Sequence, residues 1–293
     1  MRVSTQMQFS LSVRTVNQRQ SELLRTQEQI ATGRRINSFA EDPVASRKVL
    51  REQANLRQVE SGRRTSGDAQ LLLENAESAL IGVADALQRA YELNIQLAND
   101  SFDAPQRRSG ADEIRQIREQ ILSLANTERN GRYLFSGLGN TADPFQLDGT
   151  FNGDAGRLTV PVSRNTTVDA TVAGGEPFLD AAGGRNTLES LAELEDALRA
   201  NDSVQINAMI DEMLGTLERS TAARQQIGQR LQRLEFVDDV LARTELAANA
   251  TLAVERDTDI SEAVIRLRES ESGLQAALAI TGRLDDLSLL NFI

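Results

Sequence analysis

The stretch TGRRINSFAEDPVASRKV, residues 32–49, carries residue types that could bind phosphate, a glycine followed by two arginines. A phosphate-binding loop needs several glycines, so that backbone N–H groups converge on the anion, and it usually ends in Lys-Ser or Lys-Thr. This stretch has one glycine and no such ending. Instead, Gly33 suits the left-handed position after a helix, and Asp42 suits an N-cap with Pro43 at the first helical position. The stretch therefore predicts a helix–loop–helix joint.

A second candidate site lies in LDGTFNGDAG, residues 147–156, where Asp148, Asn152 and Asp154 could offer oxygen ligands to calcium. The spacing does not match an EF-hand loop, and no glutamate follows at the required distance. Asp-Gly and Asn-Gly pairs are typical of hairpin turns. We interpret these residues as turn residues and expect no metal site.

Catalytic chemistry has few candidates, because the chain contains neither histidine nor cysteine. It therefore has no imidazole base, no thiol nucleophile and no Cys/His zinc site. Carboxylates are abundant, yet no pair stands out as facing one cleft, as a glycosidase requires. We expect no catalytic residue and no cofactor.

The composition of the chain argues against some classes of partner and indicates the type of core. The net charge of -11 argues against binding to nucleic acid or to an anionic membrane, since both need a basic surface. The first 30 residues contain no long apolar run, so the sequence predicts no cleaved secretory signal, and no 18-residue apolar stretch suggests a membrane span. With 4% aromatic residues and no tryptophan, a core of Leu, Ile, Val and Ala is expected, as in helical bundles.

Apolar residues at steps of three and four predict helices over most of the chain. Long helices are expected over residues 44–99, 106–130 and 204–256, the last about 80 Å long. Two further helical segments lie at the ends, where the N-terminal apolar stripe is thin. The C-terminal segment has coiled-coil spacing, which we predict to be a self-assembly seam made of Ile260, Val264, Leu267, Leu274, Leu278, Leu284 and Leu287.

Residues 139–184 differ in character, being rich in Gly, Asp and Thr with short alternating segments, and they predict a small β-rich insertion. The expected fold is mainly α, a long antiparallel helical bundle or coiled coil formed by the N- and C-terminal halves. The expected domains are a terminal segment (1–42 plus 257–293), a bundle (43–138 plus 185–256) and the insertion (139–184). Folding back at the insertion would bring the two helix breaks, near residues 33–43 and 256–261, together.

Three stretches resemble the bacterial flagellins and hook-associated proteins, most of all the hook–filament junction members. They are residues 32–43, GRYLFSG at 131–137 and LQAALAITGRLDDLSLLNFI at 274–293. Glu41 departs from the usual aspartate, and Leu290 stands where an aromatic residue is more common. The first stretch completes the set of joint residues, which are Gly33, Ile36, Asn37, Asp42 and Pro43.

The resemblance implies a flagellin-like fold and a structural, non-enzymatic role as an adaptor between flagellar hook and filament. It implies an extracellular place in the bacterial flagellum, reached through the flagellar type III apparatus without a cleaved signal peptide. The implied partners are copies of the chain in a ring or tube, the other hook–filament junction protein, flagellin, and an export chaperone at the C-terminal segment. No nucleic acid, membrane or cofactor is implied.

Residues 1–40 and 258–293 each bury too little surface to offset the cost of ordering a chain. We hypothesise that they order fully on assembly, which would confine polymerisation to the growing tip. Alternatives are flagellin itself, the bulk filament subunit, or a cytoplasmic coiled-coil scaffold. An enzyme carried in residues 140–184 is a further alternative, because some flagellin relatives carry peptidase insertions there.

Overall fold

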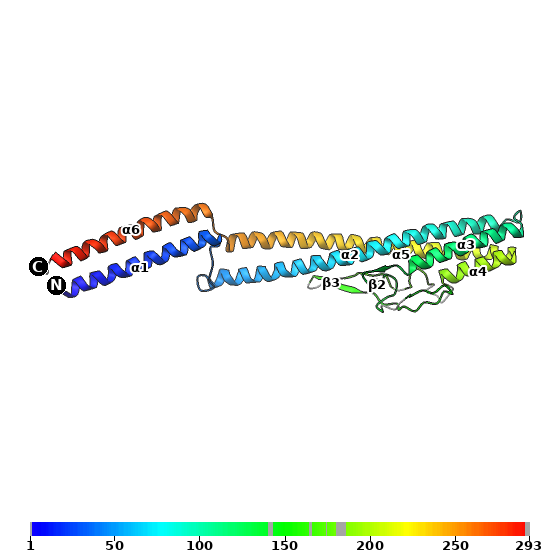
Figure 1. Ribbon diagram of the computed structural model, residues 1–293, viewed down its shortest axis with the longest axis horizontal. Helices are drawn as coiled ribbons and strands as arrows, with labels where there is room; N and C mark the ends of the chain where they lie inside the picture. Colours follow the sequence, from blue (N-terminus) through cyan, green and yellow to red (C-terminus); the bar gives the residue numbers. More distant parts are fainter. Residues whose placement is uncertain (1, 140–142, 164–165, 174, 180–185, 291–293) are drawn as a thin grey trace. The chain divides into compact units, whose positions relative to one another are not determined.

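The computed structural model describes residues 2–139, 143–163, 166–173, 175–179 and 186–290. The side chains of residues 2–6, 8–9 and 283–290 lie outside that description. The helices are α1 (Arg2–Thr32), α2 (Pro43–Ala98), α3 (Ala104–Ala125), α4 (Thr187–Ala200), α5 (Ser203–Glu255) and α6 (Ile260–Leu290) (Figure 1). The strands are β1 (Glu128–Arg129), β2 (Arg132–Tyr133), β3 (Thr159–Ser163) and β4 (Thr166–Asp169). The prediction of a mainly helical chain with a small β-rich insertion is confirmed.

The chain forms two compact units. The first contains Met1–Arg57 and Arg243–Ile293, and the second contains Gln58–Ala242. The first unit joins the two ends of the chain, the second is one continuous stretch, and the limits between them fall inside α2 and α5. The three domains expected from the sequence stay a prediction.

The second unit has one hydrophobic cluster, to which α2, α3, α4, α5 and the insertion all contribute. Its larger fully buried members on the helices include Leu73, Leu80, Leu87, Ile114, Ile121, Leu191 and Leu194. Most of the apolar residues in the C-terminal half of α2 are buried, but Ile95 is 46% exposed. The buried face instead keeps a seven-residue repeat, from Leu87 to Asn94 and from Ala90 to Leu97, which is the period of helices that wind around each other. Ile95 lies eight residues after Leu87 and so falls outside that face.

The end of α3 differs from the prediction. A helix was expected to reach residue 130, whereas α3 ends at Ala125 and the chain turns through the short hairpin of β1 and β2. Asn130 and Gly131 lie between the strands with φ of 52° and 76°. Positive φ at both turn positions is the geometry that favours Asn-Gly in two-residue hairpins. The Asn-Gly pair is therefore the local signal that ends the helical region.

The insertion is fixed to the bundle by aromatic packing and by one close backbone approach. Phe135, Phe145 and Phe178 are buried, and their rings meet at centroid distances of 5.4 and 4.9 Å. β3 pairs with β4 in antiparallel register. Gly62 of α2 is buried beneath β3, and a Cβ atom there would lie 2.2 Å from the carbonyl oxygen of Val162. Glycine thus lets this strand cross directly on the helix backbone.

A buried arginine closes the turn between α2 and α3. Arg107 is 4% exposed, and its Nε donates to the carbonyl oxygen of Leu97 at 3.0 Å. Its two Nη atoms donate to Asn201 Oδ1 at 2.9 Å and to the carbonyl oxygen of Asn99 at 3.3 Å. One side chain therefore satisfies the last carbonyls of α2 and ties them to the turn between α4 and α5.

Candidate functional site: the joint and the terminal helix pair

In the first unit the two helix breaks bond to each other, as folding back at the insertion predicts. α1 ends at Thr32, and the next residue, Gly33, has a φ of +67°, which suits a residue without a Cβ atom. The Thr258 N–H donates to the Gly33 carbonyl at 3.0 Å, and the Arg35 N–H donates to the Arg256 carbonyl at 2.7 Å. These two bonds flank an antiparallel bridge between Arg34 and Asp257. Residues more than 200 positions apart thus form one short β-like pairing.

Asp42 starts α2, as expected for an N-cap followed by Pro43. Its Oδ1 accepts from the N–H groups of Ala45 at 2.9 Å and Val44 at 3.2 Å. The Ala45 hydrogen bond is the largest effect on the pKa of Asp42 and lowers it below 3.8; Arg35, whose Nη1 lies 3.6 Å from Oδ2, lowers it further. The carboxylate is therefore held ionised at the first turn of the helix.

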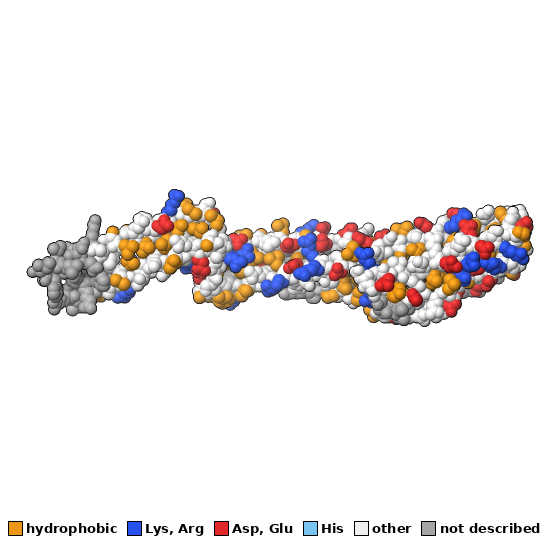
Figure 2. All heavy atoms as spheres, in the orientation of Figure 1, with side chains coloured by type: hydrophobic (Ala, Val, Ile, Leu, Met, Phe, Trp, Pro, Cys, Tyr) orange, Lys and Arg blue, Asp and Glu red, His pale blue; other side chains and the backbone are white. Residues whose placement is uncertain are grey.

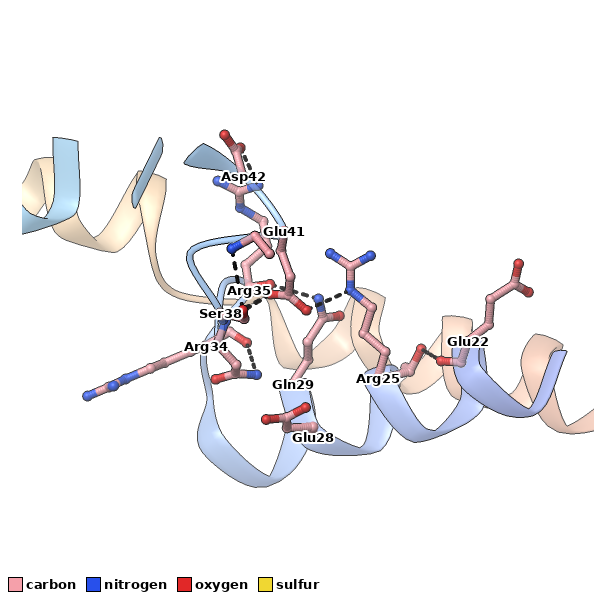
Figure 3. A network of polar contacts seen from close by, with 12 residues as sticks. Glu22, Arg25, Glu28, Gln29, Arg34, Arg35, Ser38, Glu41 and Asp42 are labelled. Atoms are coloured by element: carbon pink, nitrogen blue, oxygen red, sulfur yellow. Dashed lines mark hydrogen bonds and ion pairs between the residues drawn. The ribbon is translucent and has the colours of Figure 1, made fainter. Parts of the chain in front are cut away.

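Glu41 organises the loop itself (Figure 3). Its Oε2 accepts from the N–H groups of Asn37 at 2.9 Å and Ser38 at 3.4 Å, while its Oε1 lies 3.1 Å from Nε of Arg25 on α1. Gln29 of α1 donates from Nε2 to the Arg35 carbonyl at 2.8 Å. Two side chains thus fasten the loop back onto the last turns of α1.

Arg35 and Lys48 extend these ties to α5. Arg35 Nη2 donates to the Glu255 carbonyl at 2.7 Å, and Lys48 Nζ lies 2.5 Å from Glu255 Oε1. Glu255 is the last residue of α5. The end of α5 is therefore bound both to the loop and to the first turns of α2.

The structure also places the remaining predicted joint residues. Ile36 and Asn37 are half-buried, and Asn37 Oδ1 accepts from the Thr32 hydroxyl at 2.9 Å. Thr26 and Gln29 were not among the predicted residues, although they are 8% and 6% exposed. They lie three positions apart on the face of α1 where apolar residues would be expected. That polar pair in a thin apolar stripe is the signal that could have found them.

The terminal pair of α1 and α6 packs side by side and antiparallel (Figure 1). Of the predicted seam, Val264, Leu267 and Leu274 are half-buried, whereas Ile260 and Leu278 are 49% and 53% exposed. The side chains of Leu284 and Leu287 lie outside the described residues. Among the side chains described on α1 and α6, Ala263 is the only apolar one that is buried. The single chain therefore covers its seam only in part.

The aspartates considered above as calcium ligands instead accept hydrogen bonds from backbone N–H groups in turns. Asp154 accepts from the N–H groups of Leu138, Gly139 and Gly156 at 2.9, 2.6 and 2.6 Å, and these bonds, Leu138 first, lower its pKa below 3.8. Asp148 accepts from the Thr150 N–H at 2.9 Å. The described residues contain no group of three or more acidic side chains placed to hold a metal ion. In the same part of the chain, every helix is too short or too polar to cross a membrane.

Comparisons with known proteins agree with this architecture. Residues 3–140 match the bacterial flagellin N-terminal helical region. Flagellar hook-associated protein 3 of Salmonella typhimurium is 26% identical over 314 residues, covering 99% of this chain and 98% of that protein. Its Escherichia coli counterpart is 27% identical over 317 residues, with the same coverage of each chain. Bacterial flagellins are similar too, but over less of this chain, for example 86% with Bacillus subtilis flagellin.

The fold has solved counterparts. The structure of a flagellar hook-associated protein from Vibrio parahaemolyticus superimposes with a TM-score of 0.68 at 22% identity, covering 73% of this chain and 98% of that one. At that identity the likeness concerns the fold. The matched N-terminal region and the end-to-end relatives show that the chain is similar to the bacterial flagellins and, along its whole length, to flagellar hook-associated proteins.

Proposed function

We propose that the chain is a structural subunit of the bacterial flagellum, an adaptor that joins hook to filament and assembles through α1 and α6. The observation that carries the proposal is the match to flagellar hook-associated protein 3 along 99% of this chain and 98% of the relatives. The match includes both terminal helices, which are the segments that a junction subunit needs in order to mate with neighbours on two sides.

The terminal helix pair, α1 and α6, accounts for how the subunits would assemble. Ordering a backbone costs about 1–2 kcal/mol per residue, and a pair of 31-residue helices with so little buried apolar surface gains little in return. Neighbouring copies would cover the exposed parts of the seam, Ile260 and Leu278 among them. The terminal helices then become fully stable only in the assembly, which would restrict growth to its tip.

The adaptor role is non-enzymatic. The partners we infer are further copies in a ring or tube, the other hook–filament junction protein, flagellin, and an export chaperone that binds the C-terminal segment. The place of the protein is the extracellular flagellum, reached through the flagellar type III apparatus without a cleaved signal peptide. The absence of histidine and cysteine, which removes the commonest catalytic groups, supports the non-enzymatic role.

The experiment that tests the proposal is deletion of the coding sequence, followed by electron microscopy of the flagella. A junction subunit predicts hooks without filaments, together with flagellin released into the medium. Restoration of attached filaments by the full-length chain is the control. Attached filaments on the deletion strain would contradict the adaptor role.

Flagellin itself is the second candidate, because flagellins also match the chain. Copy number separates the two: a junction subunit is a trace component of sheared filaments, whereas flagellin makes up their bulk. Secretion distinguishes the adaptor from a cytoplasmic scaffold, since the adaptor should reach the medium only when the flagellar export apparatus is intact.

A further inference from the structure

A groove lies beside the joint, apart from the network centred on Glu41. Its apolar wall is formed by Ile36, Phe39, Val49 and Leu50, and Ser46, Arg34 and Arg256 also line it. Phe39 and Leu50 are 53% and 54% exposed. Figure 2 shows hydrophobic side chains on the surface over this loop and the first turns of α2. We call this surface the joint groove.

Two polar side-chain groups of the joint groove have no partner among the residues that the structure describes. Ser46 is 7% exposed, and its hydroxyl has no hydrogen-bond partner among the described residues. This oxygen has almost no accessible surface, so a docked partner would pack over it without bonding to it. The guanidinium of Arg34 forms no ion pair with any described side chain, and it extends away from the network in Figure 3. The groove therefore fits a partner that combines an apolar side chain with carboxylates.

One surface of this same chain has that chemistry. On α5, Phe236 and Val240 are 68% and 44% exposed, and they lie four residues apart on one face. Glu235 and Asp239 form a parallel row beside them, exposed and without a described ion pair. Like charges at this spacing repel each other, so a cation from outside would relieve the strain between them. We call residues 235–240 the α5 ridge.

We propose that the α5 ridge of one copy docks in the joint groove of the next copy. Phe236 would lie against Phe39 and Leu50, and the carboxylate row would face Arg34. The argument rests on the proposed function, because it presumes that copies of the chain assemble. It deepens that function by naming a contact outside the terminal helix pair and the residues on both of its sides.

The form of the contact agrees with such an assembly. The groove and the ridge are different surfaces of one chain, so their pairing is heterologous. Heterologous contacts leave one free groove and one free ridge at the ends of any partial assembly, and they therefore continue into a ring or a helical array. A self-complementary patch would instead close into a dimer. Opposite charges on the two surfaces also favour the docked partner over alternatives.

Cross-linking tests the contact directly, because the natural chain has no cysteine. Two differently tagged chains, Phe39→Cys and Phe236→Cys, would be co-expressed in the deletion strain, and isolated flagella treated with a short bismaleimide. The matched control replaces Phe236→Cys with Leu71→Cys, since Leu71 is an apolar residue of α2 that is 50% exposed. Docking raises the local thiol concentration to the millimolar range, so we expect about tenfold more mixed product from the Phe236 pair.

Equal yields from the two pairs, or no mixed product, would overturn the inference. Cross-linking of Phe39→Cys to a different flagellar protein in place of a second copy would overturn it as well. Preserved motility of each single variant confirms that the assemblies tested are functional.

Charge reversal gives an independent readout. Arg34→Glu should reduce the amount of chain retained in flagella about fivefold, and Asp239→Arg should do the same, since each leaves like charges facing across the contact. The double variant should recover most of the loss. Normal retention of Arg34→Glu would reject the contact while leaving the adaptor role intact, and that role fails separately if the deletion strain keeps attached filaments.

Discussion

At the scale of single residues, the joint depends on side chains that form hydrogen bonds with backbone N–H and carbonyl groups. Asp42 is an example: its carboxylate serves as N-cap of α2 and faces Arg35. The sequence predicted the cap from Asp-Pro alone. It could not show that the same carboxylate faces a guanidinium, because that contact depends on the path of the loop between α1 and α2.

We predict that Asp42→Ala weakens the first unit at neutral pH and that the difference from the natural chain disappears in acid. The folded pKa of Asp42 is lowered below 3.8, so its stabilising effect is complete above pH 3.8 and is lost as the pH falls through the lower folded pKa. Urea unfolding of both proteins at pH 7, 5 and 3 measures this. A difference that persists unchanged at low pH would show that the cap does not act through its charge.

Arg107 is the residue whose loss should cost the second unit most among its polar side chains. Arg107→Met removes the donor to the Leu97 carbonyl, the donor to Asn201 Oδ1 and one of the two donors to the Asn99 carbonyl, and we expect about 3 kcal/mol of lost stability. The stability of the Arg107→Lys protein should lie between those of the natural chain and the Arg107→Met protein, because an ammonium cannot reproduce the planar set of donors.

The matched control is the neighbouring Arg108→Met, since Arg108 is exposed and we expect a change within about 0.5 kcal/mol. Midpoints of urea unfolding followed by far-ultraviolet circular dichroism give all three values. Equal midpoints for the Arg107→Met and Arg108→Met proteins would contradict the assigned role.

At the scale of elements, the helices follow from apolar periodicity and the breaks follow from Gly, Pro and Asx residues. α2 and α5 begin within one residue of their predicted starts, because Asp42-Pro43 and Asp202 mark those starts locally. The end of α3 was predicted five residues too late. Residues 126–131 contain no helix breaker except the Asn-Gly pair at the end, and the hairpin there is stabilised by insertion residues that packing alone brings close.

Glycines within α2 provide a test of how the insertion is seated. Gly62→Ala places a Cβ atom 2.2 Å from the Val162 carbonyl oxygen, so β3 must move and the protein should lose stability. Gly67→Ala, five residues further along the same helix, meets no atom within 4 Å and should gain about 0.5–1 kcal/mol from helix propensity. Thermal unfolding of the two variants should therefore shift in opposite directions. A gain for both would mean that β3 does not rest on the helix backbone.

At the scale of the whole molecule, the two units differ in how much apolar surface they bury. The second contains the large hydrophobic cluster, whereas the described terminal helices bury one apolar side chain, Ala263. Stability is therefore unevenly distributed, and local opening should concentrate in α1 and α6.

Hydrogen exchange on the dilute free chain measures this distribution. We expect amides of residues 264–282 to exchange orders of magnitude faster than those of residues 73–97, because opening α6 exposes little apolar surface. After assembly the same α6 amides should become protected. Strong protection of α6 in the dilute chain would refute ordering on assembly.

The sequence by itself determined the helical class, the positions of the breaks, the turn chemistry and the exclusion of thiol or imidazole catalysis, because each of these depends on local spacing or composition. Only the tertiary structure decided that Gly33 bonds to Thr258 and Arg35 to Arg256, that Thr26 and Gln29 are buried, and that the α6 seam is half covered. Those facts concern residues distant in the chain. Local propensity carries no information about which distant carbonyl an N–H group meets, so these contacts are known only from the folded structure.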